Sequence, residues 1–277
     1  MLSVVRTAIG NIPHLTPTVY ENSWFIDYSS ISISPNDFFG NVLRSIAFEI
    51  EREIKRVNTP VDKQIWEMSP RTVNAYFSPT KNEIVFPAGI LQPPFFDPEL
   101  DDAVNYGATG GIIAHEITHG FDDEGRKYDK DGNMKDLWSK NDAEEFERRA
   151  KSVVNLYSEL EALPGLRVNG ELTLGENIAD IGGVSIAYEA LQRKLTRNPV
   201  LRKKIDGLTP EQRFYISWSQ SWRANIRQEA VKWQVSYDPH SPDNFRGEIP
   251  AVVHYKFNEH FRGSVSVGKK NRGVITI

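Results

Sequence analysis

The chain has 277 residues, of which 39% are hydrophobic and 25% charged, and its formal net charge is −4. This composition is typical of a globular protein with a full core, and the mild acidity argues against a nucleic-acid partner, which needs a basic face. No apolar run in the sequence approaches the roughly 18 residues that a membrane span requires. Cysteine is absent, so a metal site here would use His, Glu, Asp and water.

The first part of the chain predicts one long helix. Residues 1–35 are expected to be irregular or weakly extended, with three prolines as punctuation, and their start is a poor signal peptide. Over 38–57, apolar residues recur at three- and four-residue spacing, which predicts an amphipathic helix that Thr59-Pro60 ends. We expect one face of this helix to pack on the core.

Two short strands are predicted next, at 73–77 and 83–86, joined by a five-residue turn. They form either a plain hairpin or an edge that holds an extended peptide by strand addition, and the sequence favours neither alternative. Residues 87–105 contain a Pro-Pro pair and a Phe-Phe pair and are expected to be a loop.

A helix expected over 106–121 carries the pattern His115-Glu116-x-x-His119. Residues four apart lie on one helix face, so the two imidazoles would point at one metal ion, and Glu116 would reach a water bound to it. The alternative is a pair of buried, hydrogen-bonded core histidines. The pattern favours the metal site. Glycines in the first turns of this helix are unfavourable, which indicates close approach of a neighbouring element.

Residues 122–138 are expected to be a polar loop. Its stretch 129–133 resembles a calcium loop only superficially, because the glycine falls too early and the terminal Glu is missing, so a turn is predicted. A helix is expected over 141–160, with Asn141 as its cap and Glu144 as the reciprocal partner.

A second helix that bears on the site is predicted over 174–194, with Glu176 and Asp180 four residues apart beside apolar positions. Carboxylates next to a buried surface need partners, because an unpaired buried charge is costly. Alone, the pair is more typical of a helix surface. Together with the histidine helix, it favours a metal ligand and a carboxylate that orients a ligand histidine.

The C-terminal third predicts a capped helix after Thr209-Pro210, a loop over 237–246 and a last helix over 252–261. His240 and Arg246 lie in that loop, and loops on rigid scaffolds often carry function. The remaining histidines are expected to be structural or on the surface: His14, His254 and His260.

Three protein ligands plus one water describe a catalytic zinc site. His115, His119 and Glu176 supply three ligands, and Glu116 is the expected general base, which would later return the proton to a leaving amine. His240 is a candidate donor to the oxyanion, and Asp180 is expected to orient His115.

Assembled in this order, the chain resembles the catalytic half of the neprilysin and endothelin-converting-enzyme family of zinc metallopeptidases, which have a thermolysin-like active site. The resemblance covers most of the chain. It rests on five blocks: Val73 to Tyr76, Glu83 to Ala88, His115 to Asp122, Gly175 to Asp180, and His240 to Arg246.

The resemblance implies a single catalytic domain over 1–277, a mainly α fold with a small β-sheet (α+β), and one Zn²⁺ per chain. It also implies site roles: Asn74 and Ala75 bind the substrate backbone, His240 stabilises the transition state, Arg246 contacts a substrate carbonyl, and Ser221 and Trp222 line a hydrophobic specificity pocket. The implied substrates are peptides, cleaved on the amino side of large apolar residues. The implied location is the cell surface, the exterior or the periplasm, with the cytoplasm left open.

Two departures from the family pattern stand out. The family carries a large N-terminal helical portion that caps the active site, and this chain begins after most of it, so that portion is a candidate partner. The family tends to end in a short motif with a terminal Trp, whereas this chain ends at 272–277 with Arg-Gly-Val-Ile-Thr-Ile. The rival hypotheses are a zinc-binding module without turnover and a hydrolase that acts on other bonds. The intact set of catalytic positions favours the peptidase.

Overall fold

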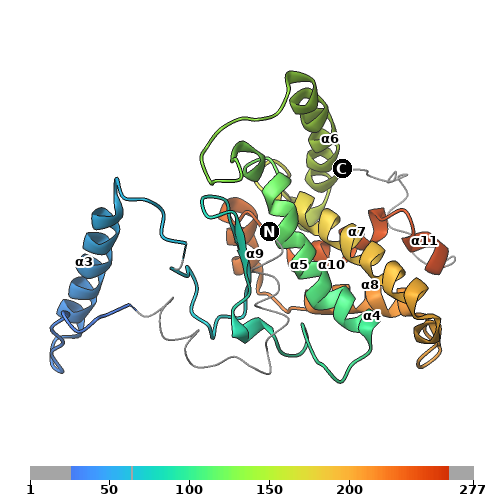
Figure 1. Cartoon of the computed structure of the whole chain (residues 1–277), viewed down its shortest axis with the longest axis horizontal. Helices are drawn as coiled ribbons and strands as arrows, with labels where there is room; N and C mark the ends of the chain where they lie inside the picture. Colours follow the sequence, from blue (N-terminus) through green and yellow to red (C-terminus); the bar gives the residue numbers. More distant parts are fainter. Residues whose placement is uncertain (1–25, 64, 262–277) are drawn as a thin grey trace. The chain divides into compact units, whose positions relative to one another are not determined.

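The computed structural model of the chain describes residues 26–63 and 65–261. The described part divides into two compact units that meet in the sequence between Ser69 and Pro70. Helices predominate (Figure 1), and the sheets of the described residues are two small two-stranded ones. The expected mainly α fold with a small β component is therefore confirmed.

The first unit contains helix α3, Phe38–Arg56. Asp37 caps it by accepting a hydrogen bond from the Gly40 backbone N–H at 2.9 Å, and the backbone turns extended at Val57. The expected packing of its apolar face on a core is wrong. No residue of α3 is buried, because residues 26–69, as far as they are described, contain no other helix or strand to cover it.

The second unit opens with the predicted hairpin. Strands β1 (Tyr76–Ser78) and β2 (Glu83–Val85) are antiparallel, with Phe77 opposite Ile84. The other hairpin, β3 (Glu161–Leu163) and β4 (Leu166–Arg167), was not predicted. Strands of two or three residues are too short to show the alternation that identifies a strand in a sequence.

The helix that carries the histidines begins earlier than predicted. It runs through α4 (Asp102–Asn105), a π-helical turn (Tyr106–Gly110), α5 (Gly111–Thr118) and a 3-10 turn (His119–Phe121). The Asp101 side chain caps its start by accepting a hydrogen bond from the Ala103 N–H at 2.9 Å.

The glycines at the start of this helix lie where a neighbouring helix comes close. A Cβ on Gly107 would lie 2.2 Å from the Phe214 carbonyl oxygen, and one on Gly111 would lie 2.7 Å from the Trp218 ring. Phe214 and Trp218 belong to α8 (Pro210–Ser221). The expected close approach is thus confirmed at Gly107 and Gly111 but not at Gly110, where the nearest atom lies 3.5 Å away in the same helix.

Helix α6 spans Lys140–Ser158, and its predicted cap was wrong by two residues. Ser139 caps the helix by accepting a hydrogen bond from the Asp142 N–H at 3.2 Å. Ser and Asn are both favoured at this position, so a sequence with both cannot decide between them. Within the preceding loop, Asp129 Oδ1 accepts backbone hydrogen bonds from Asp131 and Asn133, which confirms a turn at this place.

The remaining helices are α7 (Leu174–Arg197), α9 (Gln228–Tyr237), α10 (Asp243–Val253) and α11 (Phe257–His260), with 3-10 turns at Ala88–Ile90, Gly125–Lys127 and Pro199–Arg202. The predicted capping box of α8 is present, with Thr209 and Gln212 bonded reciprocally. The last helix predicted over 252–261 is wrong, because the chain turns extended at His254 and a separate short helix follows.

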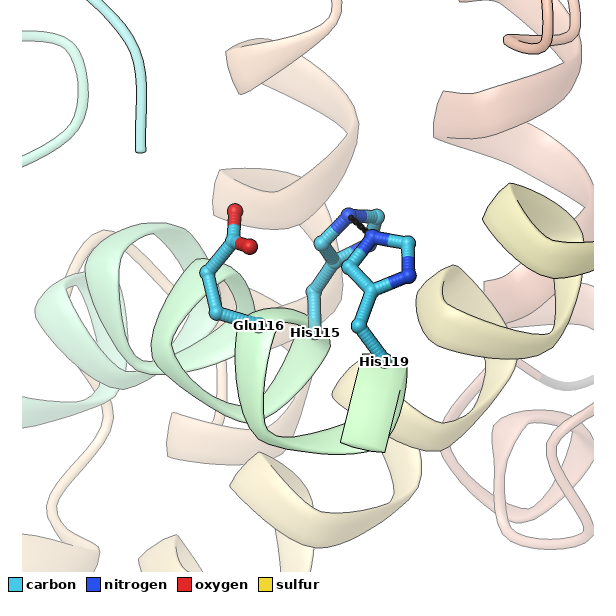
Figure 2. A group of neighbouring side chains, drawn as sticks. All are labelled: His115, Glu116 and His119. Atoms are coloured by element: carbon cyan, nitrogen blue, oxygen red, sulfur yellow. Dashed lines mark hydrogen bonds between the residues drawn. The ribbon is translucent and has the colours of Figure 1, made fainter. Parts of the chain in front are cut away.

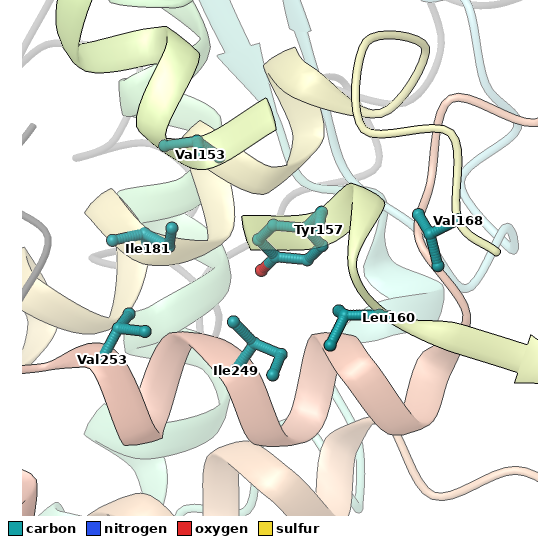
Figure 3. Packing of buried hydrophobic residues seen from close by; sticks show 7 residues of the cluster. All are labelled: Val153, Tyr157, Leu160, Val168, Ile181, Ile249 and Val253. Atoms are coloured by element: carbon teal, nitrogen blue, oxygen red, sulfur yellow. The ribbon is translucent and has the colours of Figure 1, made fainter. Parts of the chain in front are cut away.

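The core joins α6, α7 and α10 around the tyrosine of α6 (Figure 3). Its members share near-complete burial: Val153, Tyr157, Leu160, Val168, Ile181, Ile249 and Val253. Helix α7 also packs along α5, and a Cβ on Gly183 would lie only 2.8 Å from the Gly111 carbonyl oxygen. This tight contact brings the acidic face of α7 against the two histidines.

Candidate active site

The two histidines of the motif turn their Nε2 atoms toward one another from one face of the helix (Figure 2). His115 Nε2 and His119 Nε2 are 3.0 Å apart, and the rings cross at 90°. His115 is buried, whereas His119 keeps 16% of its side chain exposed. The imidazoles thus converge at a point that solvent reaches from the His119 side.

Glu176 approaches the histidines from the first turn of α7. Its Oε2 lies 3.3 Å from His115 Nε2, and its Oε1 lies 3.6 Å from His119 Nε2. Burial alone would raise the pKa of Glu176, but hydrogen bonding and charge from His115 and His240 hold that pKa well below its ordinary value. The structure therefore brings the third predicted ligand to the first two.

These residues fit a divalent cation. Glu176 Oε2 is buried, with His115 Nε2 at 3.3 Å and Arg246 Nη2 at 3.6 Å. Each histidine has a carboxylate at its Nδ1, which leaves Nε2 free to ligate. Burial alone would lower the pKa of His115, but Asp180 and Glu176 raise it to about 10, so the site favours positive charge at this point. Two imidazoles and a carboxylate are the donors that zinc accepts with one position left for water.

A carboxylate lies beside the other nitrogen of each histidine. Asp180 Oδ1 is 2.8 Å from His115 Nδ1, and Asp180 is completely buried. Asp122 Oδ2 is hydrogen-bonded to His119 Nδ1 at 2.7 Å. The sequence interpretation missed Asp122, although its place three residues after His119 was a usable signal, because a ligand histidine generally donates its other N–H to a carboxylate.

Glu116 leaves the helix on the same side as the two imidazoles (Figure 2). One carboxylate oxygen of Glu116 and one ring nitrogen from each histidine lie within 4.8 Å of one another. Glu116 is 5% exposed, and burial raises its pKa above the ordinary value of a glutamate. A carboxylate in this place is suited to exchanging a proton with a water between the histidines.

Arg246 was predicted to lie in a loop but lies on α10, which begins at Asp243. Its Nε and Nη2 donate to the two oxygens of Asp180 at 2.8 and 2.9 Å. Burial alone would raise the pKa of Asp180, but the Arg246 charge and the contact with His115 lower it. Most of the guanidinium is therefore committed to a carboxylate that supports a histidine.

His240 reaches the site from the loop before α10. Its Nε2 lies 3.2 Å from Glu176 Oε1, and its Nδ1 is hydrogen-bonded to Asp238 Oδ1 at 2.7 Å. Burial alone would lower the pKa of His240, but the hydrogen bond and charge of Glu176 raise it. Asp238 was also missed in the sequence, although an acidic residue two positions before a loop histidine is a signal for such a pair.

Asn74 and Ala75 precede β1. The Asn74 side chain is exposed and accepts a hydrogen bond from the Ala75 N–H at 2.9 Å through Oδ1. Strand β1 contacts the histidine helix, with a Cβ on Gly120 placed 3.6 Å from the Phe77 ring. The two residues thus lie at the end of a strand beside the histidine helix.

Ser221 and Trp222 are neighbours in the sequence, but their side chains have different surroundings. The Ser221 hydroxyl donates to the Ser217 carbonyl at 3.1 Å. The Trp222 ring stacks on the Arg246 guanidinium, with its centre 3.8 Å from Cζ, and lines a pocket of about 610 Å³ between α8 and α10. Neither Ser221 nor any of the predicted metal ligands lines that pocket.

The comparisons agree with this geometry. The model of peptidase family M13 matches residues 74–270. The chain is 43% identical over 221 residues to neprilysin-3 of Drosophila melanogaster and 41% identical over 244 residues to endothelin-converting enzyme 1 of Homo sapiens. These matches cover 79% and 86% of this chain but 28% and 30% of the relatives, so the chain spans about three tenths of their length.

Solved structures show the same fold. The chain is similar to the zinc metalloprotease ZMP1 of Mycobacterium tuberculosis, crystallised with an inhibitor, with a TM-score of 0.80 and 45% sequence identity. That match covers 85% of this chain and 36% of the other. No helix of the described residues is long and apolar enough to cross a membrane. On the extent of the family match and the identity to its members, the chain belongs to peptidase family M13.

Proposed function

We propose that this chain carries the catalytic machinery of a zinc endopeptidase or oligopeptidase. The observation that carries the proposal is the convergence of the His115 and His119 Nε2 atoms with the Glu176 carboxylate, each contact being 3.6 Å or less. Three protein ligands with an open fourth position are typical of catalytic zinc, whereas structural sites close that position.

Glu116 is the proposed general base. Zinc held by His115, His119 and Glu176 would lower the pKa of its water to about 7 and polarise a substrate carbonyl. Glu116 would accept a proton from the attacking water and would later return it to the leaving amine. The position of Glu116 supports this role, because one of its carboxylate oxygens lies within 4.8 Å of a ring nitrogen of each histidine.

His240 is the proposed donor to the oxyanion. The Asp238 carboxylate accepts a hydrogen bond from Nδ1 at 2.7 Å, so Nε2 is the nitrogen that faces the site, and it donates when the imidazole is protonated at both nitrogens. A preorganised donor stabilises the charge that develops on the carbonyl oxygen during attack. Asp180 acts indirectly, since its contact with Nδ1 orients the His115 ring.

The substrate is proposed to be a peptide that lies along β1. Asn74 and Ala75 are proposed to bind its backbone at the start of that strand. Arg246 Nη1, the nitrogen outside the ion pair with Asp180, is proposed to contact a substrate carbonyl. Ser221 and Trp222 are proposed to shape a hydrophobic pocket, with cleavage on the amino side of large apolar residues. The geometry supports Trp222 better than Ser221, whose hydroxyl is bonded to its own helix.

We propose that the helical portion that the family resemblance implies is a partner of this chain and restricts the size of the substrate. The relatives that the chain matches are longer than this chain. The resemblance to the family also leads us to propose action at the cell surface, outside the cell or in the periplasm.

Cleavage of a quenched fluorescent peptide tests the proposal. We expect cleavage by the wild-type chain, loss of cleavage with a zinc chelator, recovery on adding zinc, and a kcat about 10²- to 10⁴-fold lower for Glu116→Gln, which removes the base. One zinc per chain with no cleavage of any short peptide would favour a zinc-binding module without turnover. Activity on esters or other amides alone would favour a hydrolase that acts on bonds other than peptide bonds.

A further inference from the structure

A buried hydrogen bond joins two residues that the proposed mechanism does not use. Ser241 Oγ donates to Asn177 Oδ1 at 2.7 Å, and both residues are 0% exposed. Asn177 follows Glu176 on α7, and Ser241 follows His240 in the loop before α10. The bond therefore ties the backbone beside a proposed ligand to the backbone beside the proposed oxyanion donor.

The Asn177 side chain is itself fixed by a hydrogen bond to Thr173. Its Nδ2 donates to Thr173 Oγ1 at 2.8 Å, and Thr173 Oγ1 donates to the Asn169 carbonyl at 3.0 Å. Thr173 is 1% exposed. With its amide group bonded to Thr173, Asn177 presents a fixed carbonyl oxygen to Ser241, and a buried acceptor of this kind is costly to leave unpaired.

The His240 loop has few other side-chain ties to α7. Asp238 orients the imidazole but belongs to the same loop. The contact of His240 Nε2 with Glu176 Oε1 also joins the two segments at 3.2 Å, but a cation at the proposed site would compete with His240 for the oxygens of Glu176. The bond between Ser241 and Asn177 does not involve the ligand atoms and remains.

We infer that Ser241 and Asn177 are positioning residues that hold the His240 imidazole at a fixed place over Glu176. The inference rests on the proposed function, in which His240 donates to the oxyanion. A donor to the oxyanion acts only at hydrogen-bond distance, and a misplacement of about 1 Å lowers the rate by about 10²-fold.

The test compares Ser241→Ala with Ser241→Thr and with Ser217→Ala. Ser217 is the matched control, because it is a buried serine whose hydroxyl donates at 2.7 Å to the Val104 carbonyl, outside the site. For Ser241→Ala we expect kcat to fall about tenfold with KM unchanged, because a displaced donor loses part of its effect on the transition state alone. We expect Ser241→Thr to retain kcat within about twofold, because it keeps the hydroxyl.

Two further measurements separate positioning from folding. Zinc content is expected to stay at one per chain in all three variants, and Ser217→Ala is expected to lower the unfolding temperature as much as Ser241→Ala does while it keeps the wild-type kcat. If Ser241→Ala does not fold, Ser241→Cys provides the same test, since a thiol is a weak donor of similar size.

A double-mutant cycle with His240→Phe tests whether Ser241 acts through His240. If Ser241 acts through His240, Ser241→Ala lowers kcat in the wild-type background and has no further effect in His240→Phe. Equal losses in both backgrounds, or a wild-type kcat in Ser241→Ala, would overturn the positioning role alone. A wild-type kcat in His240→Phe would overturn the proposed role of His240 and this inference with it.

Discussion

The Arg246 guanidinium pairs with the Asp180 carboxylate through two hydrogen bonds, from Nε at 2.8 Å and from Nη2 at 2.9 Å. Arg246 is 6% exposed and Asp180 is fully buried. Asp180 in turn lies 2.8 Å from His115 Nδ1. A buried ion pair therefore supports the proposed metal ligand His115, and its removal is expected to change both the stability of the fold and the geometry of the metal site.

Replacement of Arg246 by Met is expected to destabilise the fold by about 3–5 kcal/mol, because it removes the charged partner of the buried Asp180 carboxylate and leaves only the contact with His115. Urea unfolding measures the loss. Arg148→Met is the control, because Arg148 pairs with Glu145 on an exposed surface, and its unfolding midpoint is expected to match the wild type. Equal stability of the wild type and Arg246→Met would show that the pair contributes nothing to folding.

Two glycines near the start of the histidine helix are expected to respond oppositely to a methyl group. In Gly107→Ala the added Cβ would lie 2.2 Å from the Phe214 carbonyl oxygen, and a loss of about 1–3 kcal/mol is expected from overpacking. In Gly110→Ala the nearest atom is 3.5 Å away and the backbone is helical, so a gain of up to about 1 kcal/mol is expected. Thermal unfolding of both variants checks the contrast, which equal changes would contradict.

Asp122 is expected to tune the metal affinity through His119. Asp122→Asn keeps an oxygen for the Glu124 and Gly125 N–H groups but removes the charge beside His119 Nδ1. The affinity for zinc is expected to fall about 10- to 100-fold. Competition with a coloured chelator measures it, with Glu124→Gln as the control. An unchanged affinity in Asp122→Asn would exclude this role.

Zinc is expected to stabilise the chain through the same three ligands. A ligand that binds only the folded state adds about 2.7 kcal/mol when its free concentration is 100 times Kd. The unfolding temperature of the wild type is expected to rise with zinc and to fall with chelator. Glu176→Gln, which weakens one ligand, is expected to need more zinc for the same rise. A temperature that does not depend on zinc would contradict a site formed in the folded state.

His254 is expected to make the stability depend on pH, far from the metal site. It is 4% exposed, its Nδ1 is hydrogen-bonded to the Tyr215 hydroxyl at 2.6 Å, and burial lowers its pKa to about 4. The unfolded chain, with a pKa near 6.5, takes up the proton first. The contribution is therefore full above about pH 6.5 and is lost as the pH falls towards 4, by about 2 kcal/mol between pH 7 and pH 5.

Urea unfolding at pH 7 and pH 5 checks this dependence, with His254→Gln as the comparison. The variant lacks the titrating ring and is expected to lose less stability over the same interval. An identical pH dependence in both proteins would show that His254 is protonated as readily in the folded chain as in the unfolded one.

The parts of the site that were predicted from the sequence are those set by helix geometry. His115 and His119 share a face because they lie four residues apart, and Glu176 and Asp180 do so for the same reason. The structure brings the four together because a glycine at position 183 lets α7 approach α5. That these two helices meet was inferred from the need of buried carboxylates for partners, and the resemblance supported it.

The parts that were missed or wrong depend on tertiary contacts. The burial of Arg246 follows from Asp180, which lies 66 residues away. The exposed face of α3 follows from the absence of another helix or strand in residues 26–69, as far as they are described. The predicted domain bounds at 1–277 stay a prediction, and the divergent end at 272–277 lies outside the described residues.

The close contact of Gly183 with α5 bears on how much the proposed metal site would rearrange when an ion binds. With a carbonyl oxygen 2.8 Å from the place of a Cβ, the two helices have no room to slide or rotate against one another. The donor atoms on α5 and α7 are then spaced by the backbone before any ion is present. Ion binding is expected to reorder very little of the chain. The measured affinity is therefore expected to reflect the interaction of the ion with its ligands, with little free energy spent on ordering them.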